Sequence, residues 1–294
     1  MTQPANIDLV HLGLEGAIGS YLIFGEEPAL VDPGPATTFE RLQEGLADHG
    51  IGARDLRHVL LTHVHLDHAG ATGDLVEAFP EATVHVHEDG APHMVDPTRL
   101  VASTRRTFGD NHDRLWGVTR AVPADRVQAW RVDDPHRPAG LRPVATPGHI
   151  SHHLAYLDEG EGTLYSGDSM GIVFEEDVPT HTPTPPPAID LRAWESTLTQ
   201  IEAIAPERFG AAHFGFHGST AVRCRELQSA LHALEERVRQ ALASGDDGDA
   251  DRFEQEVRDR LGPQLGRARV DGYFDMFPAA TDWAGVAFYL KRNP

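Results

Sequence analysis

Residues 59–70 place four potential metal ligands directly after an apolar run that predicts a buried strand. The ligands are His63, His65, Asp67 and His68. Imidazole nitrogen and carboxylate oxygen together suit zinc, iron or manganese. Side chains on an extended segment repeat every two residues, so His63 and His65 point to the same side and can share one ion. A helix that starts near Asp67 would direct Asp67 and His68 toward a second ion.

The alternative interpretation is that these are ordinary surface histidines, because the chain holds 18 histidines among 294 residues. However, chance clustering of three histidines and one aspartate within six residues, at the end of an apolar strand, is improbable. Clusters of this kind are typical of metal sites. We therefore interpret the cluster as a set of metal ligands.

Net charge and residue types restrict the partners and the location. The chain has 45 acidic and 25 basic residues, a formal charge of −20, and such a field repels nucleic acid. No apolar stretch approaches the roughly 18–20 residues of a membrane span, and no signal peptide is evident, so we expect a cytoplasmic protein without membrane contact. The single cysteine, Cys224, agrees with a reducing compartment and is expected to be a small core residue.

Strands alternate with helices along most of the chain, which predicts α/β layers. Two strands precede the first helix, which argues against a purely parallel sheet. We expect strands at 7–12, 20–32 (a pair turning at 25–28), 58–62, 82–87, 127–132, 141–145, 154–157, 162–165 and 208–212. We expect helices at 37–49, 72–79, 98–108, after the capping residue Asp190, at 219–243, and in two pieces within 252–294.

Two connections have no clear periodicity. Residues 88–120 contain aromatic side chains that suit a lid or pocket wall, or else a solvated connection that packs on its own aromatics. Residues 175–189 contain five prolines, and we favour a loop that crosses the domain surface over an interdomain linker.

Three further ligand-type residues follow predicted strands. A Pro-Gly turn directly precedes His149, so this histidine is rigidly held. Asp168 follows a glycine and could bridge two cations or simply form a turn. His213 lies at the end of an apolar strand and is favoured as a ligand over His217, which lies farther from the strand end.

The cluster at 63–68 resembles the H-x-H-x-D-H signature of the metallo-β-lactamase superfamily. His149, Asp168 and His213 follow in the same order as the later His, Asp and His of that pattern. The resemblance covers about residues 7–215. It implies one ion bound by His63, His65 and His149, and another bound by Asp67, His68 and His213, with Asp168 between them. It also places Asp32 near the site and His153 outside the ligand set as a hydrogen-bonding residue. His152 is expected to be exposed, and a surface or pocket-rim position is expected for His85, His87, His93 and His181.

The same resemblance implies a fold of the α/β class, the αββα sandwich. In it, two mixed sheets pack face to face with helices outside and the site lies at one edge. We expect this core over residues 1–218 and a helical extension over residues 219–294 packed on the core. The extension either narrows the pocket or forms a homodimer interface.

The implied function is a dinuclear metal-dependent hydrolase with two divalent ions, zinc first and iron or manganese as alternatives. A hydroxide bridging ions about 3.5–4 Å apart would attack an acyl carbon, and Asp67 would orient it and move its proton. The ligand order is similar to that of glyoxalase II and of lactonases, so the expected substrate is a small ester, lactone or thioester. The alternatives are an iron-dependent, oxygen-using redox enzyme, a phosphodiesterase, or a metal-stabilised binding module on the same fold.

Overall fold

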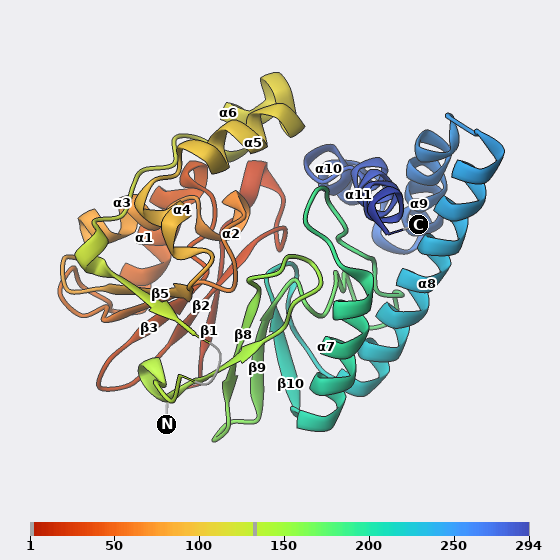
Figure 1. Cartoon of the computed structure of the whole chain (residues 1–294). Helices are drawn as coiled ribbons and strands as arrows, with labels where there is room; N and C mark the ends of the chain where they lie inside the picture. Colours follow the sequence, from red (N-terminus) through yellow and green to blue (C-terminus); the bar gives the residue numbers. More distant parts are fainter. Residues whose placement is uncertain (1–2, 132–133, 294) are drawn as a thin grey trace.

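The computed structural model describes residues 3–131 and 134–293. Three positions of the predicted core and extension lie outside the described residues, namely 1, 2 and 294. The last residue of the strand predicted at 127–132 lies outside them too. Two sheets pack face to face with helices on their outer faces (Figure 1). The predicted αββα sandwich is therefore confirmed. No helix in the described part combines the length and apolar character needed to cross a membrane.

The first sheet is mixed and has the strand order β1-β2-β3-β4-β5-β6. The strands are β1 Ala5–Asp8, β2 Gly19–Ile23, β3 Ala29–Val31, β4 His58–Leu60, β5 Thr83–His87 and β6 Val127–Trp130. The first three strands are antiparallel, and β3 to β6 are parallel, joined by crossovers that contain α1 (Phe39–Asp48) and α3 (Thr72–Ala78). The strand predicted at 7–12 ends early, because Val10 and Leu12 adopt left-handed backbone angles around a short 3₁₀ turn.

The second sheet has the order β11-β10-β9-β8-β7. Its strands are β7 Arg142–Ala145, β8 Leu154–Asp158, β9 Thr163–Gly167, β10 Arg208–Ala211 and β11 Gly215–His217. Only β9 and β10 are parallel, and α7 (Leu191–Ile204) connects them, with Asp190 accepting from the N–H of Ala193 as the predicted cap. The strand β11 was not expected; Phe214 and Gly215, both with positive φ, make the tight turn that returns the chain.

Three apolar layers hold the sandwich together. Tyr21 from the first sheet packs with Tyr156 and Tyr165 from the second, so aromatic rings fill the space between the sheets. Helices α1 and α3 cover the outer face of the first sheet. On the outer face of the second sheet, Trp194 of α7 packs in one core with the C-terminal helices. Cys224 lies buried in this core with its sulfur 3.6 Å from that of Met170, as expected for a core residue.

The irregular segment after β5 forms three short helices beside the first sheet. They are α4 (Ala91–Val95), α5 (Thr98–Phe108) and α6 (His112–Trp116). Helix α5 confirms the helix predicted at 98–108, and it has no fully buried residue. In Figure 1, α5 and α6 project from the rim of the sandwich toward the C-terminal helices.

The C-terminal part forms four helices, α8 (Thr220–Ser244), α9 (Asp249–Leu265), α10 (Arg267–Met276) and α11 (Ala279–Arg292). The two pieces expected within 252–294 are therefore three helices, because Gly266 has φ 83° and separates α9 from α10. The connection between α8 and α9 is short, and Asp249 at the start of α9 is buried and accepts two hydrogen bonds from Arg237. Leu231 and Leu234 of α8 lie in the core shared with α7. The division at residue 218 stays a prediction.

Gly148 lies in the turn after β7, directly before His149, and has φ 148°. A Cβ atom there would lie 2.4 Å from Cβ of Trp194, which is fully buried in α7. Gly148→Ala is therefore expected to lower the free energy of unfolding by about 1–3 kcal/mol, measured by denaturant titration. Gly218→Ala is the matched control, because a Cβ at that position meets no atom within 4 Å. Equal losses in the two variants would contradict the steric argument.

Candidate metal centre

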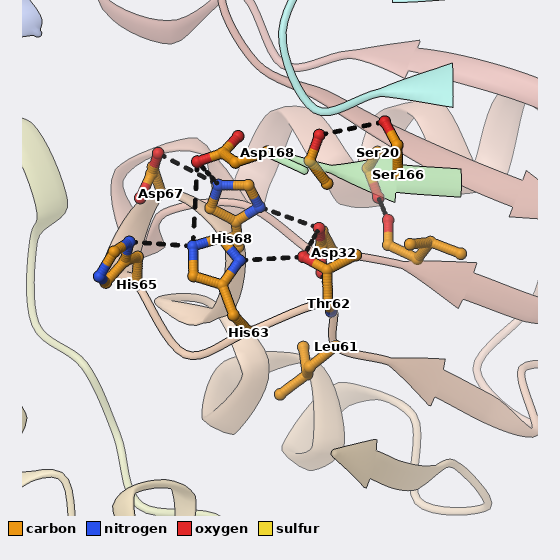
Figure 2. A network of polar contacts seen from close by, with 12 residues as sticks. Ser20, Asp32, Leu61, Thr62, His63, His65, Asp67, His68, Ser166 and Asp168 are labelled. Carbon is orange, nitrogen blue, oxygen red and sulfur yellow. Dashed lines mark hydrogen bonds and ion pairs between the residues drawn. The ribbon is translucent and has the colours of Figure 1, made fainter. Parts of the chain in front are cut away.

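The loops at one edge of the sandwich bring all seven predicted ligands together. They follow β4 directly, occupy the short helix α2 (Leu66–Ala69), and follow β7, β9 and β10. In this order they are His63 and His65, then Asp67 and His68, then His149, Asp168 and His213. The start of a helix at Leu66 agrees with the predicted change of direction before Asp67. Figure 2 shows His63, His65, Asp67, His68 and Asp168 directed toward one another.

The first group consists of His63, His65 and His149. Nδ1 of His65 lies 2.9 Å from Nε2 of His63 and 2.9 Å from Nε2 of His149. Nδ1 of His149 lies 2.8 Å from the carbonyl oxygen of Pro183, which can only accept, so this nitrogen carries the proton. Nε2 of His149 therefore presents a lone pair to the other two rings.

Thr62 fixes His63 in the same tautomer. The Thr62 hydroxyl donates to Asp32 over 2.7 Å, so its oxygen accepts from Nδ1 of His63 at 3.1 Å. Burial lowers the pKa of His63 well below its ordinary value and that of His65 to about 3, so both rings are neutral. Lone pairs that face one another at hydrogen-bond distance are satisfied by a shared cation, which suits a metal ion.

The second group consists of Asp67, His68 and His213. Oδ2 of Asp67 lies 3.4 Å from Nε2 of His68 and 3.8 Å from Nε2 of His213. Nδ1 of His213 donates to the carbonyl oxygen of Ala17 over 2.6 Å, which again leaves Nε2 free to bind a cation.

Asp168 lies between the two groups. Its Oδ2 is 3.3 Å from Nε2 of His149 in the first group and 3.5 Å from Nε2 of His68 in the second. Its Oδ1 is 3.6 Å from Nε2 of His213. One carboxylate therefore reaches ligand atoms of both groups, in the position expected for a bridging ligand.

The carboxylates make the centre favourable for positive charge. Burial lowers the pKa of His68, but the charges of Asp67 and Asp168 outweigh burial and raise it well above its ordinary value. Burial likewise raises the pKa of both aspartates, yet the charge of His68 outweighs it and lowers the pKa of Asp67 to about 2 and that of Asp168 well below its ordinary value. Among the described residues, Nε2 of His68 and Oδ1 of Asp168 are buried without a hydrogen-bond partner. Such atoms cost about 1–3 kcal/mol each, a cost that a cation removes.

Two residues outside the ligand set hold the ligands in place. Asp32 accepts the N–H of Thr62 at 2.8 Å through Oδ1 and Nδ1–H of His68 at 2.9 Å through Oδ2 (Figure 2). The backbone N–H of Asp168 donates to Nε2 of His153 over 3.2 Å, so Nδ1 of His153 carries the proton and donates to Thr146. Asp32 therefore contacts the imidazole of His68, and His153 contacts the backbone of Asp168; their supporting roles stay predictions.

The expectations for His85, His87 and His152 were wrong. His152 is buried rather than exposed, with its ring centroid 6.4 Å from that of His87. His85 and His87 are buried too, because Tyr156 and Pro143 of the second sheet lie beside His85, and Trp130 and His152 lie beside His87. By contrast, His93 and His181 both line the pocket, in agreement with the expected surface or pocket-rim position, although His181 is itself buried. His217 lies in β11 with Nδ1 3.7 Å from Glu176, apart from both ligand groups.

Sequence reasoning missed His11, a fully buried residue near the second group. Its ring stacks on Trp116 with centroids 5.7 Å apart, and in the described part of the chain neither ring nitrogen has a hydrogen-bond partner. Burial lowers the pKa of His11 to about 4, against an opposing effect of the Asp67 charge. No motif marks this residue, since its position depends on the 3₁₀ turn after β1.

The proline-rich segment 175–189 also differs from expectation. Residues 175–177 are exposed, but residues 180–182 and Thr184 are buried, so the segment crosses the surface only in part. Asp282 of α11 accepts the N–H of Thr184 at 2.7 Å and lies 2.9 Å from Nε2 of His181. The carbonyl of Pro183, between these residues, is the partner of His149. A helix outside the ligand loops therefore supports the orientation of a ligand.

Asp282→Ala is expected to reduce the metal affinity of the first group about tenfold, at the lower end of effects seen for residues that support ligands. The segment loses two hydrogen bonds, and the carbonyl that orients His149 becomes less restrained. Competition with a chromophoric chelator measures the affinity. Asp275→Ala in the neighbouring helix α10 is the control, since Asp275 is exposed and pairs with Arg258. An unchanged affinity in a folded Asp282→Ala variant would refute the coupling.

The ligand cluster opens into a cavity of about 420 Å³. His65, Asp67, His149, Asp168 and His213 contribute to its lining. Apolar walls come from the irregular segment after β5, the proline-rich segment and the C-terminal helices. These walls include Leu100, Phe108, Trp116, Pro183, Pro185, Tyr273 and Phe277, and Ile150 and Ile172 from the loops after β7 and β9 add to them. The segment 88–120 therefore contributes a pocket wall, and the C-terminal helices narrow the pocket.

Comparison with known sequences gives a consistent assignment. A sequence model described as Metallo-beta-lactamase superfamily matches residues 15–213. The metallo-beta-lactamase fold-containing protein ST1585 of Sulfurisphaera tokodaii is 28% identical over 165 residues, 54% of this chain and 61% of that protein. Thioesterase pkgB of Emericella nidulans is 33% identical over 140 residues, 47% of this chain and 31% of that protein. The matches thus span less than two thirds of these two curated relatives.

Comparison with solved structures supports the same fold. The crystal structure of ST1585 from Sulfolobus tokodaii superposes with a TM-score of 0.65 at 23% identity and covers 80% of this chain and 86% of that chain. The di-iron-bound form of TTHA1623 superposes with a TM-score of 0.53 at 25% identity and covers 75% of this chain and 96% of that chain.

Proposed function

Since the chain belongs to the metallo-β-lactamase superfamily, whose members are generally metal-dependent hydrolases, we propose that it hydrolyses a small ester, lactone or thioester with two divalent ions. The observation that carries this proposal is the pair of three-residue groups that share Asp168 between them. Similarity to a protein named as a thioesterase supports an acyl substrate. The ligand order supports a place near the thioesterase and lactonase branches of the superfamily.

Each group of residues would hold one ion. The first would be bound by His63, His65 and His149, and the second by Asp67, His68 and His213, with Asp168 contacting both. When bound, two divalent ions acidify a water molecule and polarise a carbonyl oxygen. Mostly neutral imidazole ligands suit zinc, and the di-iron-bound form of TTHA1623 supports iron as the alternative.

The protein's own groups then position the reactants. Asp67 remains a carboxylate, because His68 lowers its pKa to about 2, and it can accept a hydrogen bond from the attacking water and orient it. The apolar walls exclude bulk water from the acyl group. In the reaction, the water oxygen forms a bond to the acyl carbon, the carbon–oxygen or carbon–sulfur bond breaks, and the leaving group takes up a proton.

Metal analysis combined with a substrate panel tests the proposal. We expect about two equivalents of metal per chain and hydrolysis of at least some small esters, lactones or thioesters. His63→Ala should abolish this activity, whereas His232→Ala, at an exposed position on α8, should retain it. Full activity of His63→Ala would refute the proposal. Oxygen consumption by the iron-loaded protein, without hydrolysis by the zinc-loaded protein, would instead favour the redox alternative.

A further inference from the structure

Helix α5 presents a row of polar side chains to the cavity over the ligand cluster. Arg99, Ser103, Arg106 and Thr107 line the cavity together with the apolar Leu100. Arg99 and Arg106 are seven residues apart, close to two helical turns, so they lie on the same face of α5. This helix contributes no residue to either ligand group.

The two arginines differ from their neighbour Arg105. Arg105 is not part of the cavity lining, and it forms an ion pair with Asp113 at 2.6 Å. Arg99 and Arg106 have no ion-pair partner in the ranges that the structure describes. In a chain with a formal charge of −20, two unpaired guanidinium groups beside the same cavity are a local departure from the charge of the whole molecule.

The acidic residues of the cavity have other partners. Asp67 and Asp168 belong to the ligand cluster, and Asp282 contacts His181 and Thr184. None of the three forms an ion pair with the arginines within the described residues. The rest of the lining is largely apolar. The cavity thus combines a ligand cluster, apolar walls and one cationic wall.

We propose that Arg99 and Arg106 bind an anionic group of the substrate, a carboxylate or a phosphate, while the acyl carbon lies at the ligand cluster. This inference rests on the proposed function, because it specifies the substrate class of the same site. The planar guanidinium group donates two parallel hydrogen bonds to carboxylate or phosphate oxygens. The two backbones lie about 10 Å apart along the helix axis, a separation that two long arginine side chains can span to meet one anion. The apolar walls accommodate the chain that joins the anion to the acyl carbon.

A pair of substrates with acyl chains of equal carbon number tests this role. Glutaryl and pentanoyl thioesters of the same neutral thiol differ only in a terminal carboxylate or methyl group. We expect the wild type to hydrolyse the glutaryl thioester with the lower KM. In Arg99→Gln/Arg106→Gln, the KM for the glutaryl thioester should rise about 10–100-fold, the size expected for losing hydrogen bonds to a charged group, with kcat nearly unchanged. The pentanoyl thioester should change less than about threefold. Arg105→Gln is the matched control on the same helix and should leave both unchanged.

A second pair identifies the source of the anion. A pentanoyl thioester of a thiol that bears a phosphate monoester is compared with one of the same thiol bearing a hydroxyl group. If the double variant raises KM only for the charged member of this pair, the arginines bind a phosphate on the leaving group. If it raises KM only for the charged member of the first pair, they bind a carboxylate on the acyl group. Equal effects on charged and neutral members in both pairs, or no effect in either pair, would overturn the proposal.

Binding measurements separate this inference from the proposed function. Calorimetry measures the binding of two pairs of compounds to the metal-loaded protein. The first pair is glutarate and pentanoate, the acid products of the first substrate pair. The second is the phosphate-bearing thiol and its hydroxyl analogue. Stronger binding of the charged member of either pair, lost in Arg99→Gln/Arg106→Gln but kept in Arg105→Gln, supports the anion site even without hydrolysis. Equal binding within both pairs by a protein that does hydrolyse thioesters would overturn the anion site and leave the hydrolase proposal intact.

Discussion

Asp168→Asn is expected to reduce bound metal from about two ions per chain to about one and to lower kcat/KM roughly 10³-fold. The carboxylate reaches ligand atoms of both groups, at 3.3 Å from His149 and 3.5 Å from His68. An amide has no charge and only one oxygen, so it cannot serve both ions equally. Metal ions contribute several kcal/mol of transition-state stabilisation, and each 1.36 kcal/mol corresponds to a tenfold change in rate. Elemental analysis and steady-state kinetics measure the two effects.

Asp158→Asn is the matched control for this prediction. Asp158 ends β8 at the opposite end of the hairpin from the ligand loops, where it accepts the N–H groups of Gly160 and Glu161. This variant should keep both ions and full activity. Circular dichroism establishes that the Asp168→Asn variant retains its fold. Two tightly bound ions and near wild-type turnover in folded Asp168→Asn would show that this carboxylate does not bridge the groups.

Local sequence marked the candidate ligands, and the resemblance to the superfamily supplied their division into two groups. An apolar strand leads into His63 and His65, a helix begins at Leu66, and a Pro-Gly turn precedes His149. Each segment ends at the same edge of a sandwich, so adjacency in space follows from strand order. The roles of the individual ligands remain proposals that metal analysis will test.

The burial of the other histidines could not be predicted in this way. The exposure of His85 depends on Pro143 and Tyr156 of the second sheet, which lie beside it. His58, 27 residues earlier, supplies its hydrogen-bond partner at 2.9 Å. His152 is covered by a neighbourhood that includes His87. Local periodicity contains no information about such contacts. A surface position was therefore expected for these histidines, whereas the structure shows them buried.

The support of the pocket depends on still more distant pairings. His181 meets Asp282 across 101 residues, and Tyr21 hydrogen-bonds the carbonyl of Ala211 across 190. The first contact places α11 behind a ligand loop, although α11 follows the part of the chain in which the ligand motifs occur. Many of the residues that line the cavity beside the ligand cluster lie in the segment 88–120 and in the C-terminal helices, outside the ligand motifs.

Asp67→Asn is expected to lower kcat about 10²–10⁴-fold at saturating metal while changing KM little, because the amide cannot accept the proton that a carboxylate moves. The side chain is partly accessible from the cavity, unlike the fully buried His63. Its Oδ2 lies 3.4 Å from His68 and 3.8 Å from His213, so an amide oxygen in the same place can still contact the second ion, with lower affinity. Kinetics across a range of metal concentrations separate the loss of turnover from the loss of metal.

Asp74→Asn provides the comparison for Asp67→Asn, because Asp74 lies in the adjacent helix α3 and pairs with Arg120 outside the cavity. It should have wild-type kinetics. If Asp67→Asn recovers full kcat once the metal concentration is raised, the carboxylate acts only as a ligand and the proton role is wrong. If kcat stays low with two ions bound, the carboxylate has a function beyond holding metal, because occupancy alone then fails to restore turnover.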